Sequence, residues 1–477
     1  MNDFNLIEEP WIPVIYHNGN YCRVGIKQAL SDAHLIRDIA TSNPMDRAGL
    51  LRFLLSIVYW CHGMPAPQET SRLGDPLPDC TPHLGAKTNF FCLFGQKHRF
   101  YQSPTANREV KIGELFQEIP SGNNFWHFRH VTDKEHGYCP ACCALGLLRL
   151  PLFSVSGLPD LKSGINGTPP IYVFHYGKSL AQILRKNWLP MKQNLLGTPC
   201  WMDPTLVPPI GDPIPLLIGL TVPARKVWLG QPIHHGRCSL CGNPSKHLVF
   251  EAHIQSAGTL ENSNWQDPHV VYFLNQQQRK SCKAPNLVVG GEFQMDRPYA
   301  DLMACLLERV QFPATATSQL LIVGFATDKA KNIDVWERTV TLVLNEMQTT
   351  AATAFSTWWR SVSALSNNVY TIIKTTPYNR PRGSKPSYVH CHFSHIRPHV
   401  EHIISSNMHI LVSEPNEGWH EARREFSAFL PMLAQSLSPG VTSQAVQKRR
   451  AIAQALPPNP CPKPEPSSSP STQNPNL

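Results

Sequence analysis

Apolar residues along this chain follow two different spacings, which predict helices in some segments and strands in others. Asn43 precedes an apolar run with helical spacing at 48–60 and Gly63 follows it, so a capped helix is predicted there. Short apolar runs bounded by proline or glycine predict strands, and these lie at 6–14, 214–222, 226–229 and 248–254. Between about residues 65 and 210, glycine and proline interrupt most apolar runs, which predicts loops and short elements.

The spacing of apolar residues changes near residue 334. From 334 to 365 they recur at three- and four-residue intervals, which predicts an amphipathic helix. Further helical patterns at 395–405, 421–436 and 442–455 predict an antiparallel helical bundle. From 457 the chain is rich in proline and serine, which is typical of disordered segments. We therefore expect an α+β protein with a large mixed N-terminal domain over 1–333, a C-terminal helical bundle over 334–456 and a disordered tail over 457–477.

Composition narrows the class of protein. A chain of 477 residues is too long for one compact core, and 42% hydrophobic residues are enough to bury a sizeable one. The net charge is +9, but only 16% of residues are charged. This favours a protein that contacts nucleic acid at a few points over one whose affinity comes mostly from neutralising phosphates. On charge alone, a mildly basic protein with no nucleic-acid partner fits equally well. The sequence shows neither a long apolar run nor a basic start followed by an apolar stretch, so we expect a cytoplasmic protein without membrane contact.

Four of the 14 cysteines form two close pairs, Cys139 with Cys142 and Cys238 with Cys241. Two residues between the members let both thiolates reach one ion, and two such pairs complete a tetrahedron around Zn²⁺. A site closed by four thiolates is structural, because no position remains for water or substrate. The alternative is four ordinary thiols, one pair of them redox-active.

Other metal-binding side chains lie near these pairs or further along the chain. Cys143, His234 and His235 are possible substitutes for a cysteine of the pairs. The histidines and cysteine within 390–395 also resemble metal ligands, but they stand at a predicted helix start, which favours surface histidines.

Catalytic motifs do not emerge from the sequence. It contains no Gly-x-x-x-x-Gly-Lys phosphate loop, no His-Glu-x-x-His and no Gly-x-Ser-x-Gly. A zinc hydrolase would need an open metal position, which four thiolates do not leave. We therefore expect that the protein is not an enzyme.

Several segments occur in an order that resembles the CasA family. They are 6–14, which ends in Trp-Ile-Pro-Val, 91–102, 124–128, 162–170, 219–224 and 324–336, with the two cysteine pairs among them. The resemblance runs from residue 6 to about 455 and rests on the ordered set rather than on any one motif.

This resemblance implies the large, non-enzymatic subunit of a type I-E CRISPR Cascade complex. Such a subunit assembles with smaller subunits of the CasB to CasE type and with crRNA. It recognises the motif (PAM) that flanks a target in double-stranded DNA, helps to start strand separation and R-loop formation, and serves as a platform for a helicase–nuclease. Guide pairing reads the target, while protein reads the flanking base pairs. The alternative is a structural zinc-knuckle scaffold that binds nucleic acid in another RNA–protein assembly.

The resemblance also places three nucleic-acid-binding loops on this sequence. The first, ahead of the first cysteine pair, is Phe128, Arg129 and His130. The second, where the family carries a glycine loop, is Gly157, Leu158, Pro159 and Asp160 with Lys162. The third, a wedge beside the first unpaired base, is Ala326, Thr327, Asp328 and Lys329.

Alternatives stand beside these assignments. Phe128 fits a core anchor as well as a base-stacking residue. Pro159 and Asp160 replace glycines, so the family's motif preference does not carry over. Gly164 and Gly167 predict a turn. The basic residues at 448–450 and in the loop 374–385 fit a guide for displaced DNA, but also ordinary solvated helix ends.

Overall fold

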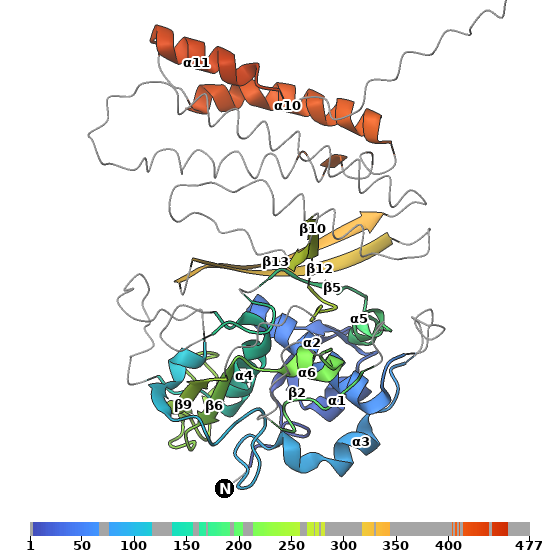
Figure 1. Cartoon of the computed structure of the whole chain (residues 1–477), viewed down its shortest axis with the longest axis vertical. Coiled ribbons are helices and arrows are strands. Elements are labelled where there is room, and N and C mark those ends of the chain that lie inside the picture. Colours follow the sequence, from blue (N-terminus) through green and yellow to red (C-terminus); the bar gives the residue numbers. More distant parts are fainter. Residues whose placement is uncertain are drawn as a thin grey trace, which may run out of the picture. The chain divides into compact units, whose positions relative to one another are not determined.

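The structure of the chain is a computed structural model, and the part that it describes is drawn in colour in Figure 1. The described residues are 3–65, 76–116, 136–155, 162–167, 170–190, 195–203, 213–257, 265–270, 272–275, 278–281, 317–328, 331–343, 403, 406–407, 410, 414–437 and 441–456. The chain forms two compact units, one of 1–289 with 318–341 and the other of 290–317 with 342–477. The first is mixed α/β, and the described part of the second is mainly helical, as expected for an α+β protein. The predicted domain ranges themselves stay predictions.

A small antiparallel sheet opens the first unit. Its strands β1 (Ile12–Tyr16), β2 (Tyr21–Val24) and β3 (Ile36–Ile39) lie in the order β2-β1-β3, with helix α1 (Ile26–Ser31) between the second and third. The strand predicted over 6–14 is therefore confirmed at its end only. Residues 6–9 form a turn, in which Glu9 donates its backbone N–H to the Asn5 carbonyl at 2.8 Å.

Helix α2 (Pro44–His62) is the centre of the first unit, and it confirms the predicted capped helix. The Asn43 side-chain oxygen accepts the Met45 N–H at 2.9 Å, and Gly63 ends the helix at φ 74°. Helices α4 (Pro140–Phe153), α5 (Leu180–Asn187) and α6 (Leu216–Thr221) contact it. The strand predicted over 214–222 is wrong because these residues form α6, a short leucine-rich helix buried among the others.

Two further sheets complete the first unit. Strands β4 (Arg108–Lys111), β9 (Glu251–Ser256) and β6 (Arg225–Leu229) form an antiparallel sheet in the order β4-β9-β6, and the short hairpin β7 (Gly236–Arg237)–β8 (Pro244–Ser245) connects β6 to β9. The other sheet has the order β13-β12-β5, from β13 (Lys331–Val343), β12 (Thr317–Asp328) and β5 (Tyr172–His175). The strand predicted at 226–229 is confirmed, and that at 248–254 is confirmed from Glu251 onward.

The helix predicted from residue 334 is wrong for its first ten residues, because 334–343 lie in strand β13. Ile333, Val335, Thr339, Thr341 and Val343 alternate along this strand. Such β-branched residues pack well on a pleated surface, and the alternation outweighs the helical spacing. The remainder of the predicted helix, 344–365, lies outside the described residues.

Helices α10 (Pro415–Leu437) and α11 (Ser443–Ala453) pack against each other in the second unit. They confirm the helical patterns at 421–436 and 442–455. Trp419, Phe426 and Leu430 are buried on α10, and the Thr442 side chain accepts the Ala445 N–H at 3.2 Å to cap α11. Most of the pattern at 395–405, the loop 374–385 and the tail 457–477 lie outside the described residues.

The remaining elements are short. They are helix α3 (Thr81–Ala86), the 3-10 helices η2 (Thr88–Phe91) and η3 (Ile112–Leu115), and the hairpin β10 (Tyr272–Asn275)–β11 (Gln278–Ser281). Among the residues that the structure describes, no helix is both long and apolar enough to span a membrane.

Candidate functional site

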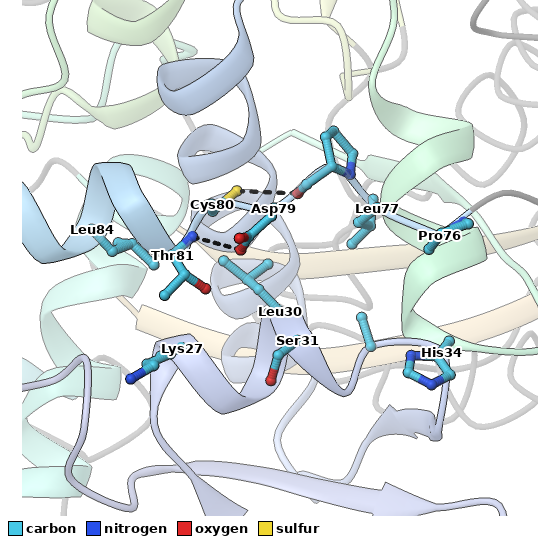
Figure 2. Close-up of a pocket in the computed structure, with 12 residues that line it drawn as sticks. Lys27, Leu30, Ser31, His34, Pro76, Leu77, Asp79, Cys80, Thr81 and Leu84 are labelled. Carbon is cyan, nitrogen blue, oxygen red and sulfur yellow. Dashed lines mark hydrogen bonds between the residues drawn. The ribbon is translucent and has the colours of Figure 1, made fainter.

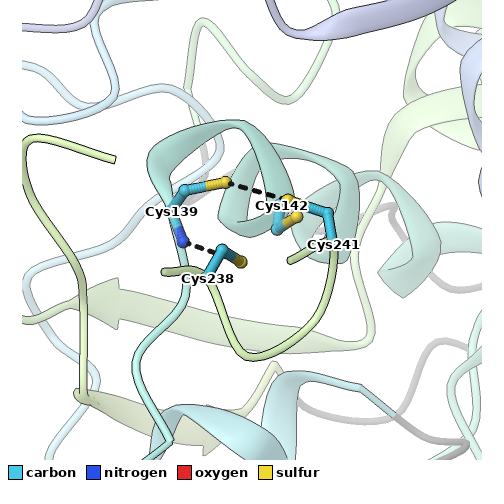
Figure 3. A group of neighbouring side chains, drawn as sticks. All are labelled: Cys139, Cys142, Cys238 and Cys241. Carbon is cyan, nitrogen blue, oxygen red and sulfur yellow. Dashed lines mark hydrogen bonds between the residues drawn. The ribbon is translucent and has the colours of Figure 1, made fainter. Parts of the chain in front are cut away.

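The first cysteine pair stands at the beginning of α4. Cys139 is the N-cap residue and Cys142 lies in the first turn, with Pro140 at the first helical position. Proline is favoured there because its missing N–H has no partner within the helix anyway. The helix start therefore fixes both thiols on one side of its first turn, as Figure 3 shows.

The second pair lies on the turn of the β7–β8 hairpin. Cys238 donates its N–H to the Asn243 carbonyl at 2.9 Å, and its own carbonyl accepts the Gly242 N–H at 2.9 Å. Gly242 has φ +72° with open space around it, so its backbone angle rather than crowding requires glycine. This tight turn brings Cys241 back beside Cys238.

Backbone contacts join the two pairs, which are about a hundred residues apart in sequence. Tyr138 and Val249 exchange N–H···O bonds of 2.9 and 2.8 Å, and Ser239 donates its N–H to the Gly137 carbonyl at 2.9 Å. A Cβ on Gly137 would lie 2.7 Å from the Phe250 ring, so this close approach needs glycine. The helix start and the hairpin are thereby held side by side.

The four sulfurs form one cluster, with all ligand atoms within 4.8 Å of one another. The Cys139 and Cys241 sulfurs are 3.9 Å apart, close to the roughly 3.8 Å expected for two thiolates on one tetrahedral ion with bonds of about 2.3 Å. The Cys139 N–H also donates to the Cys238 sulfur at 3.3 Å. The structure thus brings together all four predicted ligands in a buried cluster that can hold a metal ion.

The charges around the cluster favour a bound cation. Hydrogen bonding to Cys139 raises the pKa of the Cys142 thiol, whereas hydrogen bonding from Cys139 and Cys142 lowers the pKa of Cys241. Four crowded thiols cannot all ionise unless a cation offsets their charge. Arg23 of β2 lies beside them. Burial lowers its pKa, but a hydrogen bond to Cys241 and the charge of the nearby thiolates outweigh burial and raise the pKa above its ordinary value, so the guanidinium stays charged.

The suggested substitute ligands do not belong to this cluster. Cys143 is buried, and its sulfur lies 3.9 Å from the Tyr138 carbonyl oxygen. His234 and His235 are exposed. In the part of the chain that the structure describes, no other group of three or more such side chains has metal-binding geometry. The histidines and cysteine at 390–395 lie outside that part.

The predicted nucleic-acid loops are described only at their edges. Residues 128–130, 157–160 and Lys329 lie outside the described residues. Lys162 is exposed, and the turn predicted after it is confirmed, since Gly167 donates its N–H to the Gly164 carbonyl at 2.9 Å with φ +75°. Residues 326–328 were predicted as a loop but are the last residues of strand β12.

A buried polar network includes Asn166, in the turn that follows Lys162, and was not predicted. Asp267 pairs with Arg52 of α2 at 2.6 Å and accepts a hydrogen bond from Asn166 at 2.8 Å. Asn166 in turn accepts the indole N–H of Trp265 at 2.9 Å. Burial raises the pKa of Asp267, but the charge and hydrogen bond of Arg52 outweigh it and lower this pKa to about 2. The network fixes the turn at 164–167 to the core.

A cavity of about 240 Å³ lies beside α1 and α3 (Figure 2). Lys27, His34, Leu77 and Cys80 are among the residues that line it. The Asp79 carboxylate at its wall accepts the Thr81 N–H at 2.8 Å, and the Cys80 thiol donates to the Pro78 carbonyl at 3.8 Å. Because these polar groups bond to their own chain, we assign the cavity no ligand.

Known proteins resemble this chain in sequence and in fold. A family model described as "CRISPR-associated protein Cse1 (CRISPR_cse1)" matches residues 5–456. A curated protein of Thermus thermophilus named "CRISPR-associated protein CasA/Cse1" is 29% identical over 247 residues, which are 48% of this chain and 46% of that protein. The chain thus matches about half the length of that curated relative.

Solved structures share the fold over a longer span. The structure of Thermus thermophilus CasA (Cse1) has a TM-score of 0.70 at 18% identity and covers 96% of this chain and 99% of its own. A chain of a "CRISPR RNA-guided surveillance complex" has a TM-score of 0.67 at 16% identity and covers 94% of this chain and 98% of its own.

Proposed function

We propose that this chain, which belongs to the CRISPR-associated protein Cse1 family, is the large subunit of a type I-E Cascade complex that inspects double-stranded DNA. In this proposal it assembles with crRNA and the smaller subunits, recognises the motif that flanks a target, helps to start strand separation and offers a platform to a helicase–nuclease. It is not itself an enzyme. The observation that carries the proposal is the family match across residues 5–456.

The end of strand β12 supports a wedge at the point of strand separation. A wedge must be rigid, because otherwise the DNA would move it instead of opening. The residues of β12 from Leu320 to Phe325 are buried, and β5 pairs with this part of the strand through Leu320–His175 and Val323–Tyr172. The last residues of the strand, Ala326, Thr327 and Asp328, therefore continue from a buried and paired base.

Side-chain chemistry decides what such a wedge can contact. The Asp328 carboxylate repels phosphate but accepts a hydrogen bond from a cytosine amino group, while Lys329 binds phosphate or a base acceptor. The exposed Lys162 supplies a second cation, and the Asn166–Asp267–Arg52 network behind it limits movement of that segment. These residues would select flanking bases, while guide pairing selects the target.

We further propose that the four-cysteine cluster holds Zn²⁺ in a structural role. Cysteine thiolates in a tetrahedral set are typical of structural zinc, and four of them leave no open position for catalysis. The ion would supply the positive charge that lets the four thiols ionise together. Cys139 and Cys142 would hold it from the start of α4, and Cys238 and Cys241 from the hairpin.

Reconstitution tests this function directly. The chain is mixed with a guide complex that lacks it, and strand opening of a matched duplex is followed by permanganate reactivity of unpaired thymines. We expect opening only when the chain is present. Thr327→Ala with Asp328→Ala should reduce opening without reducing assembly, whereas Lys178→Gln, a change at an exposed lysine of the same unit, should leave both unchanged.

Two results would contradict the proposal. If the chain purifies alone as a stable RNA binder and does not join the guide complex, the zinc-knuckle scaffold explains it better. Metal-dependent cleavage of DNA by the purified chain would show that it is an enzyme.

A further inference from the structure

We infer that the hairpin carrying the second cysteine pair, residues 233–248, is a binding surface for the phosphate backbone of a nucleic acid. We call this surface the knuckle face and define it by five side chains: His234, His235, Arg237, Lys246 and His247. It is distinct from the loops at 128–130, 157–162 and 326–329, and it goes beyond the proposed flank reading.

The two permanently charged side chains of the knuckle face, Arg237 and Lys246, are both positive. The chain contains 34 acidic residues, yet none of them lies between residues 213 and 250. All five side chains of the knuckle face are exposed. An exposed concentration of cations and imidazoles without intervening carboxylates produces a positive local potential, which attracts polyanions.

Arg237 and Lys246 are the permanently charged side chains of the knuckle face, and their charges are not compensated by ion pairs in the described part of the chain. In the described part of the chain, neither Arg237 nor Lys246 forms an ion pair, and Arg237 only donates to the Gly242 carbonyl at 3.3 Å. Glu251, the first acidic residue after the hairpin, already pairs with Lys111 at 2.5 Å. Both cations therefore remain available to a partner.

The hairpin presents these side chains from a rigid frame. Gly236 pairs with Ser245 and Arg237 pairs with Pro244. His235 comes directly before Gly236 on one strand, and Lys246 comes directly after Ser245 on the other. The cysteine cluster fixes the turn at the other end, and the bridge between Ile233 and Leu248 fixes the base. Little conformational entropy is then lost when the cations bind, which favours affinity.

The surface fits a nucleic acid better than an acidic protein. Protein interfaces are built around desolvated aromatic or apolar anchors. Phenylalanine, tyrosine and tryptophan do not occur between residues 229 and 249, and the exposed large apolar side chain of the hairpin is Ile233, at 48%. Cations without stacking rings bind phosphates and not bases, so we expect contact with little dependence on sequence.

The test compares two double variants of the full chain. Arg237→Gln with Lys246→Gln removes the permanent charge of the knuckle face, and Lys87→Gln with Lys97→Gln removes the same charge from exposed lysines elsewhere in the unit. Fluorescence anisotropy gives the affinity for a random duplex DNA and for a random single-stranded RNA over a range of salt. Zinc content and melting temperature confirm that each variant is folded.

Each phosphate contact contributes roughly 0.9 to the salt slope of log K for duplex DNA and roughly 0.7 for single strands. We therefore expect the knuckle variant to lower the slope by roughly 1.8 or 1.4, respectively, and the affinity at about 0.1 M salt by more than about tenfold. An effect confined to the duplex assigns the face to DNA, and one confined to the single strand assigns it to RNA.

Three outcomes would overturn the inference. They are an unchanged slope in a folded knuckle variant, an equal loss in the control variant, and no measurable binding by the unmodified chain at low salt. None of them depends on the guide complex, so they are distinguishable from a failure of the proposed function.

Discussion

Replacing Asp267 by Asn should destabilise the first unit strongly, because it leaves the buried Arg52 guanidinium without its counter-charge. The two side chains are 0% and 2% exposed and 2.6 Å apart. Removing one partner of such a buried pair costs about 3–5 kcal/mol. Arg52 also donates to the Leu220 and Gly219 carbonyls at 2.8 and 3.3 Å, so it stays in place and cannot reach water.

The pKa of Asp267 gives a second estimate of the same interaction. It lies at about 2, below the ordinary value of about 3.9. Since each pKa unit corresponds to about 1.4 kcal/mol, the ionised carboxylate contributes roughly 2–3 kcal/mol to the free energy of unfolding at neutral pH. A lowered pKa means that this contribution is complete above about pH 4 and is lost as the pH falls toward 2.

Urea unfolding followed by tryptophan fluorescence measures this cost, since Trp265 lies in the network. We expect Asp267→Asn to lower the free energy of unfolding by about 3–5 kcal/mol at pH 7 and by less at pH 3. Adding Arg52→Met should restore part of the loss, because no charge then remains buried. In the control Glu114→Gln, the partner Arg108 is 50% exposed, and the expected cost is below about 1 kcal/mol.

If Asp267→Asn costs no more than Glu114→Gln, Arg52 does not depend on the Asp267 carboxylate. If the double variant is as unstable as the sum of its two single variants, the two side chains are not coupled.

Three more predictions concern the metal cluster and the core. The purified chain should hold one Zn²⁺ by elemental analysis, and Cys238→Ser should lose it and melt at a lower temperature; a variant that keeps full metal would contradict the ligand assignment. Gly219→Ala should cost more than about 2 kcal/mol in thermal or urea unfolding, because its Cβ would lie 2.2 Å from the buried Trp265 ring; a neutral effect would mean that the ring moves freely. Arg23→Ala should release zinc faster to a chromogenic chelator, since the guanidinium offsets thiolate charge, whereas Arg37→Ala on β3 of the same sheet should not; equal rates would remove Arg23 from the site.

The sequence predicts those elements whose ends or ligands are marked by single residues or short motifs. Asn43 and Gly63 define α2 because a side-chain cap and a left-handed backbone angle are properties of single residues. The cysteine pairs identify their cluster because the two-residue spacing already fixes each half of the tetrahedron. The separation of about a hundred residues does not prevent the cluster from forming, since the fold joins the two pairs through the Tyr138–Val249 bridge.

Elements without such signals could not be predicted. Helix α4 is buried along its whole length, so its apolar residues show no preferred face and no helical period. The sequence pattern of strand β13 predicts a helix, because apolar spacing alone does not separate a β-branched alternation from a helical stripe. The Arg52–Asp267 pair leaves no local pattern, because its members come from distant parts of the chain.

The central claim, that this chain reads the bases flanking a target, is tested most directly by selection on randomised flanks. The reconstituted guide complex, with and without the chain, is bound to matched duplexes with random flanking bases, and the bound fraction is sequenced. We expect an enriched flanking motif and strand opening only when the chain is present, with the motif altered by Asp328→Ala. Equal binding with and without the chain, or binding indifferent to the flank, would contradict it.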